Sequence, residues 1–452
     1  MTVAIRPQPG PAREYHFPDF VRRQLDNGLT LIVASVNKLP IVSVVAVVDA
    51  TALGDKKGKE GTANLTAQAL REGTTTRDGT RLALDLEKLG TSIEAGADWD
   101  STVASMTVLK DRLAAAFGIF AEVLTKPRFR TEDIERLKAE RLAERMQLLT
   151  EPRGLADESF ARFIYADNSR YAQPMSGDSR SVSSLSRDDV VSFYECNYVP
   201  PQTTLIMAGD ITIEEAVTLA ESALSEWCGE RKTSSVDADR GARDSRAIEI
   251  IVKPDAAQSE LRIGHVGVPR SHPDYFPIVV MNAVLGGLFS SRINLNLREA
   301  HGYTYGASSY YDWRRQSGPF VISTAVQSEV TREAIAETLK EIDRMHEEEI
   351  GEEELTLATS YLEGVFPIRY ETTSAIASAL ANLVMFDLPE DYYDRYRANI
   401  GSVTTHDVLD AARKHVQPER LQIVVVGNPE LVKSSIEALG FGSVRTREVT
   451  DF

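Results

Sequence analysis

The chain has 452 residues, of which 42% are hydrophobic and 26% charged. This composition is ordinary for a globular protein, and the length suggests about three domains at ~150 residues each. Acidic residues outnumber basic ones by 67 to 50, which gives a formal net charge of −17. Such a surface repels phosphate groups, so the composition argues against nucleic acid or an anionic membrane as a partner.

The cysteines and the N-terminus bear on cellular location. Cys196 and Cys228 are too few for a disulfide framework and favour a reducing compartment. The first seventeen residues contain no apolar core of signal-peptide length. No apolar run approaches the ~18 residues of a membrane span. We therefore expect a cytoplasmic protein with no membrane partner, or a periplasmic one if a signal peptide was removed.

The first half of the chain carries a series of strand and helix signals. Asn27-Gly28 between two apolar runs predicts a β-hairpin. Further elements are predicted as a strand at Ile41–Val48, helices at Ala63–Arg71 and Arg81–Leu89, strands within Ser92–Leu109, and long helices over 111–127 and 133–149. The segment 186–224 predicts a capped helix, a proline stop, an apolar strand ending in glycine, and another capped helix.

The second half repeats this order. It predicts strands at Ala247–Val252 and Ser259–Val266, a helix at Tyr275–Leu285, strands within Tyr305–Val326, and helices over 331–349 and 352–366. The segment 404–439 then follows the same pattern as 186–224. Self-similarity over about half the chain indicates an internal duplication.

The repeat predicts the domain organisation. A polar stretch at 229–246, rich in charge and serine, predicts an exposed linker between domains 1–228 and 247–452. Strands and helices do not alternate strictly, so we expect an α+β fold. Each half should form a mostly antiparallel sheet with helices mainly on one face, and the two halves should form a clamshell.

The segment Leu285–Gly306 is the most informative part of the sequence. Its helical pattern of apolar residues ends at Gly302, with Arg298 four residues before this glycine and Tyr305 beyond it. The apolar residues are Leu288, Phe289, Ile293, Leu295 and Leu297. A guanidinium and a phenol are donors suited to a carbonyl oxygen that gains negative charge. From this segment alone, a capped helix end followed by a buried tyrosine is the simpler interpretation.

Several motifs, spread over nearly the whole chain, resemble the pitrilysin/insulinase family of zinc metallopeptidases. They are DNGLTLIV, GTANLTAQALREGT, LEKLGTSIEAGADWDST, YVPPQTTLIMAGD and SSRINLNLREAHGYTYG. The similarity is greatest to the mitochondrial-processing-peptidase-like branch. It implies that Arg298 and Tyr305 bind and polarise the scissile carbonyl of a peptide. We also predict that Tyr303 and Gly302 contact the substrate, with core packing as the alternative for Tyr303.

The zinc motif of this family is degenerate here. The resemblance implies that the helix within Gly61–Thr74 should carry HxxEH, in which two histidines bind zinc and the glutamate activates water. These three positions hold Asn64, Ala67 and Gln68. Amides are poor zinc ligands, and alanine cannot accept a proton. The family's distal glutamate ligand falls within Arg141–Leu148, where Glu144 and Gln147 are both near the register.

The histidines give no substitute motif. No two of the seven lie within five residues of each other, so no helical histidine pair exists. They are His16, His265, His272, His301, His346, His406 and His415. We therefore predict no metal or cofactor in this chain.

The retained arginine–tyrosine pair and the lost zinc motif together predict a divided active site. The resemblance implies a homologous HxxEH-bearing partner, in a heterodimer or larger assembly, that supplies zinc and the general base. The substrate would be an extended peptide added as a strand to a sheet edge. A homodimer of the chain alone stays open. So do two alternative functions, a structural assembly subunit without a catalytic role and a peptide-binding clamshell protein.

Overall fold

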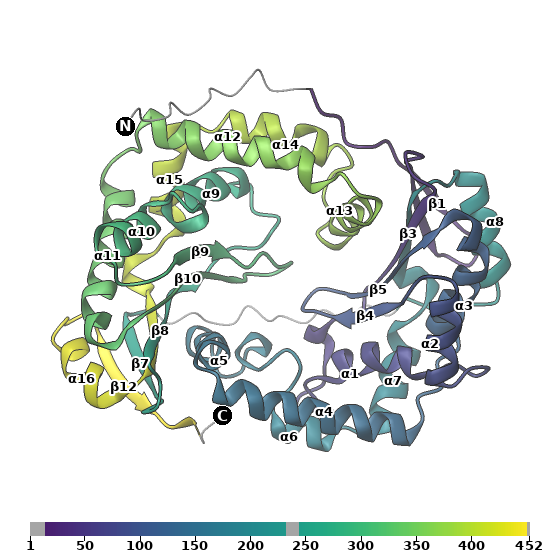
Figure 1. Ribbon diagram of the computed structural model, residues 1–452, viewed down its shortest axis with the longest axis horizontal. Coiled ribbons are helices and arrows are strands. Elements are labelled where there is room, and N and C mark those ends of the chain that lie inside the picture. The colour runs from purple at the N-terminus through teal and green to yellow at the C-terminus, as the bar shows by residue number, and fades with distance from the viewer. Residues whose placement is uncertain (1–13, 232–243, 450–452) are drawn as a thin grey trace, which may run out of the picture.

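Two six-stranded sheets form the framework of the molecule, one in each half of the chain. The computed structural model describes residues 14–231 and 244–449. The sheets stand at opposite sides of a ring-like arrangement (Figure 1), with helices around and between them. Most of the predicted linker lies outside the described residues, so the domain limits 1–228 and 247–452 stay a prediction.

The first sheet has the order β1-β2-β6-β3-β5-β4. Only the pair β2 and β6 is parallel. The predicted hairpin is confirmed, because β1 pairs antiparallel with β2 across a turn in which Gly28 has a φ of +90°. The strands are β1 (Val21–Gln24), β2 (Thr30–Ser35), β3 (Ile41–Val48), β4 (Glu94–Ala97), β5 (Thr102–Leu109) and β6 (Thr203–Gly209).

The second sheet repeats the first. Its order is β12-β7-β11-β8-β10-β9, with β7 parallel to both β12 and β11. The strands are β7 (Ala247–Val252), β8 (Gln258–Val266), β9 (Ala307–Tyr311), β10 (Pro319–Gln327), β11 (Gln422–Gly427) and β12 (Ser443–Arg447). The predicted α+β fold of two similar layered halves is confirmed.

The helices follow the same duplicated order. The first half contains α1 (Thr62–Ala69), α2 (Gly79–Lys88), α3 (Leu113–Thr125), α4 (Thr131–Thr150), α5 (Pro152–Ile164), α6 (Ser179–Ser184), α7 (Arg187–Asn197) and α8 (Ile213–Leu224). The second half contains α9 (Tyr275–Asn282), α10 (Arg292–Asn294), α11 (Thr331–Glu347), α12 (Glu352–Arg369), α13 (Thr373–Met385), α14 (Tyr392–Gly401), α15 (Thr405–His415) and α16 (Pro429–Glu437). Of the four caps predicted in 186–224 and 404–439, those at Ser186, Thr212 and Thr404 are reciprocal capping boxes, and at the fourth the Asn428 side chain accepts from the Glu430 backbone N–H.

The two halves exchange one helix each. Helix α5 of the first half packs on β8 and β11, and α13 of the second half packs on β3 and β6. On β11, Val424 and Val426 therefore join a cluster with Phe160 of α5, whereas Ile423 and Val425 join the helices of their own half. Neither α5 nor α13 was predicted from the sequence. Because each covers the other half's sheet, the two halves share their hydrophobic core.

Polar contacts also join the halves. Asp49 pairs with the Arg315 guanidinium at 2.6 Å, and Asp100 accepts a hydrogen bond from the Arg315 backbone N–H at 3.1 Å. The Tyr165 hydroxyl donates to the carbonyl of Ser317 at 2.8 Å. These contacts fix the β9–β10 loop of the second half against three segments of the first, which are the end of β3, the β4–β5 loop and the end of α5.

Asp100 leads to a prediction about pH. Its side chain is buried, and this burial raises its pKa to about 6, although the Arg315 amide opposes the shift. This folded-state pKa lies above the unfolded value, so between pH ~6 and ~4 the folded protein binds a proton that the unfolded chain does not. The free energy of unfolding therefore rises as the pH falls through this range. We expect Asp100→Asn to lose about 1 kcal/mol of the stability gained between pH 7 and pH 5.

The measurement is the free energy of unfolding by urea at the two pH values. The control is Asp111→Asn, which changes an exposed carboxylate whose side chain is 71% exposed. If Asp100→Asn has the same pH dependence as the wild type, the burial of this carboxyl does not control proton uptake on folding.

One segment of the second half is apolar enough to resemble a membrane span. Tyr275–Ala300 is a stretch of 26 residues, helical except at 288–291, that has the length and composition of a membrane span, and half of its most apolar window is buried. Here it forms part of the core, because Met281, Leu285 and Leu297 are fully buried.

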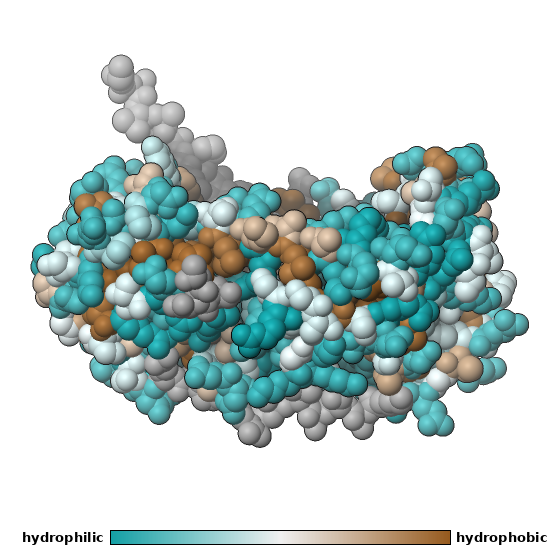
Figure 2. All heavy atoms as spheres, turned by 90° about the horizontal axis from the view of Figure 1, so that it is seen from below, coloured by the Kyte–Doolittle hydropathy of each residue, from teal (hydrophilic) through white to brown (hydrophobic). Residues whose placement is uncertain are grey.

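The face that carries α4 and α6 is largely hydrophilic, with smaller apolar patches (Figure 2).

Candidate functional site

Helix α1, which carries the degenerate zinc motif, is held at its N-terminus. The Asp55 carboxylate accepts hydrogen bonds from the backbone N–H groups of Gly61 and Ala63 at 2.8 and 2.9 Å, and it pairs with Arg170 at 3.1 Å. Burial raises the pKa of Asp55 to about 6. Gly61 has a φ of +97°, and a Cβ there would lie 2.4 Å from the carbonyl oxygen of Ser176, so only glycine fits.

The three motif positions of α1 present little that can hold a metal. Asn64 and Gln68 lie one helical turn apart and are partly exposed. Ala67 is fully buried in a small apolar cluster with Ala63. The Asn64 amide nitrogen donates to the carbonyl of Ala97 at 3.4 Å. Ala67, which occupies the general-base position, is thus part of the packed interior.

Helix α4 places an arginine against the first ligand position. The Arg141 guanidinium donates a hydrogen bond to the Asn64 amide oxygen and pairs with Glu144 at 3.0 Å. Glu144 and Gln147, the two alternatives from the sequence, are both exposed. The residue of α4 that contacts Asn64 is therefore Arg141, which the sequence analysis did not single out.

The residues present at α1 and α4 do not fit a zinc ion. Structural and catalytic zinc sites use imidazole, thiolate or carboxylate ligands, whereas α1 offers two amides and an alanine. The Arg141 guanidinium adds a positive charge at Asn64, and this charge repels a divalent cation. Arg141 thus contacts the first ligand position directly.

Arg298 lies in a widened helical turn at Leu295–Ala300, directly after α10. Its guanidinium lies 4.2 Å from the centre of the Phe289 ring, and its Nε lies 3.4 Å from a Glu299 carboxylate oxygen. The helical turn ends at Ala300, and Gly302 follows it as the predicted capping glycine, with a φ of +67° and an amide that donates to the Arg298 carbonyl at 3.2 Å. Arg298 is therefore fixed at a helix end and stays partly exposed to solvent.

The helix around Arg298 is shorter than the apolar pattern predicts. The backbone is extended at Leu288, and α10 begins only at Arg292. Ile293 and Leu297 are fully buried, but Phe289 and Leu295 are 72% and 45% exposed. The helical part of this segment therefore begins at Arg292, with Ser291 as its N-cap, and not at Leu288. The break before it leaves Phe289 free to stack on Arg298.

Tyr305 projects from the turn that follows Gly302. The Thr304 hydroxyl accepts a hydrogen bond from the Gly306 amide at 3.1 Å and donates to the Gly306 carbonyl at 2.9 Å, which shapes this turn. Tyr305 is 94% exposed, so the alternative of a buried tyrosine is wrong. Its phenol is available to a ligand.

Tyr303 has a different environment from Tyr305. Its ring is stacked on His301, with ring centres 4.9 Å apart, and it packs against the core of the second half. Its backbone N–H donates to the Leu297 carbonyl at 2.8 Å. These contacts favour core packing, the alternative stated for Tyr303. Its contact with substrate, and that of Gly302, stays a prediction.

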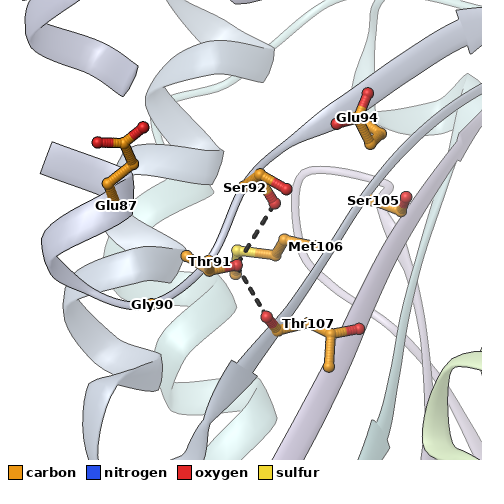
Figure 3. Close-up of a pocket in the computed structure, with 8 residues that line it drawn as sticks. All are labelled: Glu87, Gly90, Thr91, Ser92, Glu94, Ser105, Met106 and Thr107. Atoms are coloured by element: carbon orange, nitrogen blue, oxygen red, sulfur yellow. Dashed lines mark hydrogen bonds between the residues drawn. The ribbon is translucent and has the colours of Figure 1, made fainter. Parts of the chain in front are cut away.

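A pocket of about 600 Å³ lies beside β4, the terminal strand of the first sheet (Figure 3). In its lining, the Thr91 hydroxyl donates to the Thr107 carbonyl at 2.8 Å. The lining residues are Glu87, Gly90, Thr91, Ser92, Glu94, Ser105, Met106 and Thr107. The pocket includes none of the predicted catalytic residues, but it borders a sheet edge to which no other described strand is paired.

Two family profiles match the chain, one after the other along its length. Residues 32–173 match the profile described as insulinase, peptidase family M16. Residues 184–362 match the profile described as peptidase M16 inactive domain. The chain belongs to the M16 peptidase family. It contains both domain types, an N-terminal M16 domain and an inactive C-terminal one.

Relatives of this M16 chain include peptidases and a peptidase subunit. An uncharacterized zinc protease of Rickettsia felis is 25% identical over 343 residues, which are 75% of this chain and 81% of that protein. The mitochondrial-processing peptidase subunit beta of Lentinula edodes is 23% identical over 443 residues, 90% of each chain. The solved peptidase M16 inactive domain from Pseudomonas fluorescens has the same fold, with a TM-score of 0.85, 24% identity, and coverage of 91% of this chain and 98% of that one.

Proposed function

We propose that this M16 chain is a non-catalytic subunit of a heteromeric zinc metallopeptidase, in which it contributes Arg298 and Tyr305 to the active site. One observation carries the proposal. The zinc-binding residues expected on α1 are replaced, and Arg141 contacts the first of these positions. Arg298 and Tyr305, in contrast, are retained and accessible. A chain that only supported assembly would have no need of this accessible pair.

The two side chains suit the stabilisation of a carbonyl oxygen. Arg298 offers a charged donor, held in place by the Phe289 ring, and Tyr305 offers a neutral O–H on the turn beyond Gly302. Donors of this kind, aimed at a developing oxyanion, typically contribute ~2.7–4 kcal/mol each to the transition state. The partner would supply zinc and the general base, which activate the attacking water.

The comparisons support a partner of the same family. The chain is similar along 90% of its length to a protein named as a subunit of a processing peptidase. We therefore propose a homologous partner with an intact HxxEH motif. The substrate is an extended peptide, and the edge of β4, with its adjacent pocket, is the candidate place for strand addition.

Peptide cleavage by separate and combined subunits tests the proposal. The chain and an M16 protein with HxxEH from the same genome are purified separately and assayed alone and together with a fluorogenic peptide. We expect cleavage only by the mixture, and its loss after chelation. Cleavage by the isolated chain would contradict the proposal. If the partner alone is as active as the mixture, the chain serves assembly, and if the chain binds peptide but never promotes cleavage, it is a peptide-binding protein.

A further inference from the structure

A cluster of three possible metal ligands shares no residue with α1 and α4 or with the pair Arg298 and Tyr305. The loop before α9 carries His272 and Asp274, and the C-terminal residue of α15 is His415. One nitrogen of each ring and one carboxylate oxygen all lie within 4.8 Å of one another. The His415 Nε2 lies 2.7 Å from the Asp274 carboxylate, and the two imidazole rings stand edge to face at 4.7 Å.

We propose that His272, Asp274 and His415 form a binding site for a divalent transition-metal ion such as Zn²⁺. Two imidazoles and one carboxylate are a common zinc donor set, and they leave a fourth position for water. Donors at ~2.0–2.2 Å from a tetrahedral ion lie about 3.3 Å from each other. The short contact between His415 and Asp274 would have to open by less than about 1 Å to admit the ion.

The elements that carry the three ligands are already fixed in place. Helices α9 and α15 pack against each other. The Tyr311 hydroxyl donates to the carbonyl of His415 at 3.1 Å and holds this end of α15. His415 is buried, whereas His272 and Asp274 are partly exposed, so an ion can enter from solvent. The site needs rearrangement of side chains but not of backbone.

The ion would compete with existing hydrogen bonds. The His272 Nδ1 accepts from the Asp274 backbone N–H at 3.1 Å, and His415 bonds to the Asp274 carboxylate. Binding replaces at least the second of these contacts. We therefore expect moderate affinity, with a metal-dependent clamp between α9 and α15 as the consequence.

This site is independent of the proposed peptidase role. Its three residues are distinct from the degenerate motif on α1 and α4 in the first half, and also from Arg298 and Tyr305, which lie in the second half as the cluster does. Zinc in the purified chain would therefore not by itself indicate a peptidase centre, and only variants can assign it.

The test is a metal titration of the full chain without an affinity tag, because histidine tags bind zinc. After chelation, Zn²⁺ binding is measured by calorimetry, and Co²⁺ binding by visible absorption. We expect one ion per chain, with at least ~10-fold weaker binding in His272→Ala and Asp274→Asn. His406→Ala is the control, since this exposed histidine has a carboxylate neighbour, Glu349, at 3.4 Å but lies outside the cluster. Circular dichroism without metal checks that each variant is folded.

Two results would overturn the inference. One is a wild-type chain that binds no stoichiometric metal, and the other is a folded His272→Ala variant that binds it as tightly as the wild type. Binding that survives in His272→Ala but disappears in a chain with Asn64→Ala and Gln68→Ala would place zinc on α1. That last outcome would overturn the proposed non-catalytic role as well, whereas loss of binding in His272→Ala leaves that role untouched.

Discussion

Replacement of Tyr305 by phenylalanine is expected to lower the kcat of the assembled peptidase about 10²-fold, because one oxyanion donor is lost. Tyr305 is 94% exposed, so neither the fold nor its stability depends on the phenol. The substitution removes one hydroxyl and keeps the ring. We therefore expect unchanged assembly and an effect that falls on kcat more than on KM.

The measurement is steady-state peptide hydrolysis by the complex, with size-exclusion chromatography to verify assembly. Tyr361→Phe is the matched control, since it removes another exposed phenol, on α12, from a side chain that is 51% exposed. The control should keep wild-type kcat. Wild-type turnover by the Tyr305→Phe complex would exclude a role for this phenol in the reaction.

Truncation of Phe160 to alanine is expected to lower the free energy of unfolding by about 3–5 kcal/mol, the usual range for a buried phenylalanine. Phe160 is 3% exposed and lies on α5, where it packs against the sheet of the other half. A Cβ built at Gly264 of β8 would be only 3.2 Å from its ring, so the contact is close. The resulting cavity would lie in the core that the two halves share.

Urea unfolding measures this effect, with Leu84→Ala as the control because this leucine of α2 is 46% exposed. We expect the control to change stability by less than about 0.5 kcal/mol. A shared core also predicts that both halves unfold together. Two separate transitions in the wild-type protein would contradict the packing role of α5.

Local signals explain which elements could be predicted from the sequence. The Asn27-Gly28 turn and the capping boxes at Ser186 and Thr404 depend on neighbouring residues, and all three occur as expected. Helix α5 also has a helical apolar pattern, with Leu155, Phe160 and Phe163 buried. Its packing partner could not be predicted, because that surface belongs to strands about 100 or more residues later in the chain.

At the candidate sites, too, contacts between segments far apart in the sequence could not be predicted. The loss of the zinc motif is evident from Asn64, Ala67 and Gln68 alone. The contact of Arg141 with Asn64 depends on how α4 is rotated against α1, and sequence spacing left two other residues as alternatives. Likewise, His272 and His415 are 143 residues apart, so a search for neighbouring histidines cannot find them.

We propose that this chain completes an active site whose zinc is held by another subunit. The most direct test adds increasing amounts of the chain to a fixed amount of its HxxEH-bearing partner and follows the rate of peptide hydrolysis. We expect the rate to rise to a plateau with the wild-type chain. The rate of hydrolysis should stay near background with a chain that combines Arg298→Ala and Tyr305→Phe, although both chains bind the partner equally. Equal plateaus for the two chains would show that Arg298 and Tyr305 do not contribute to a shared active site.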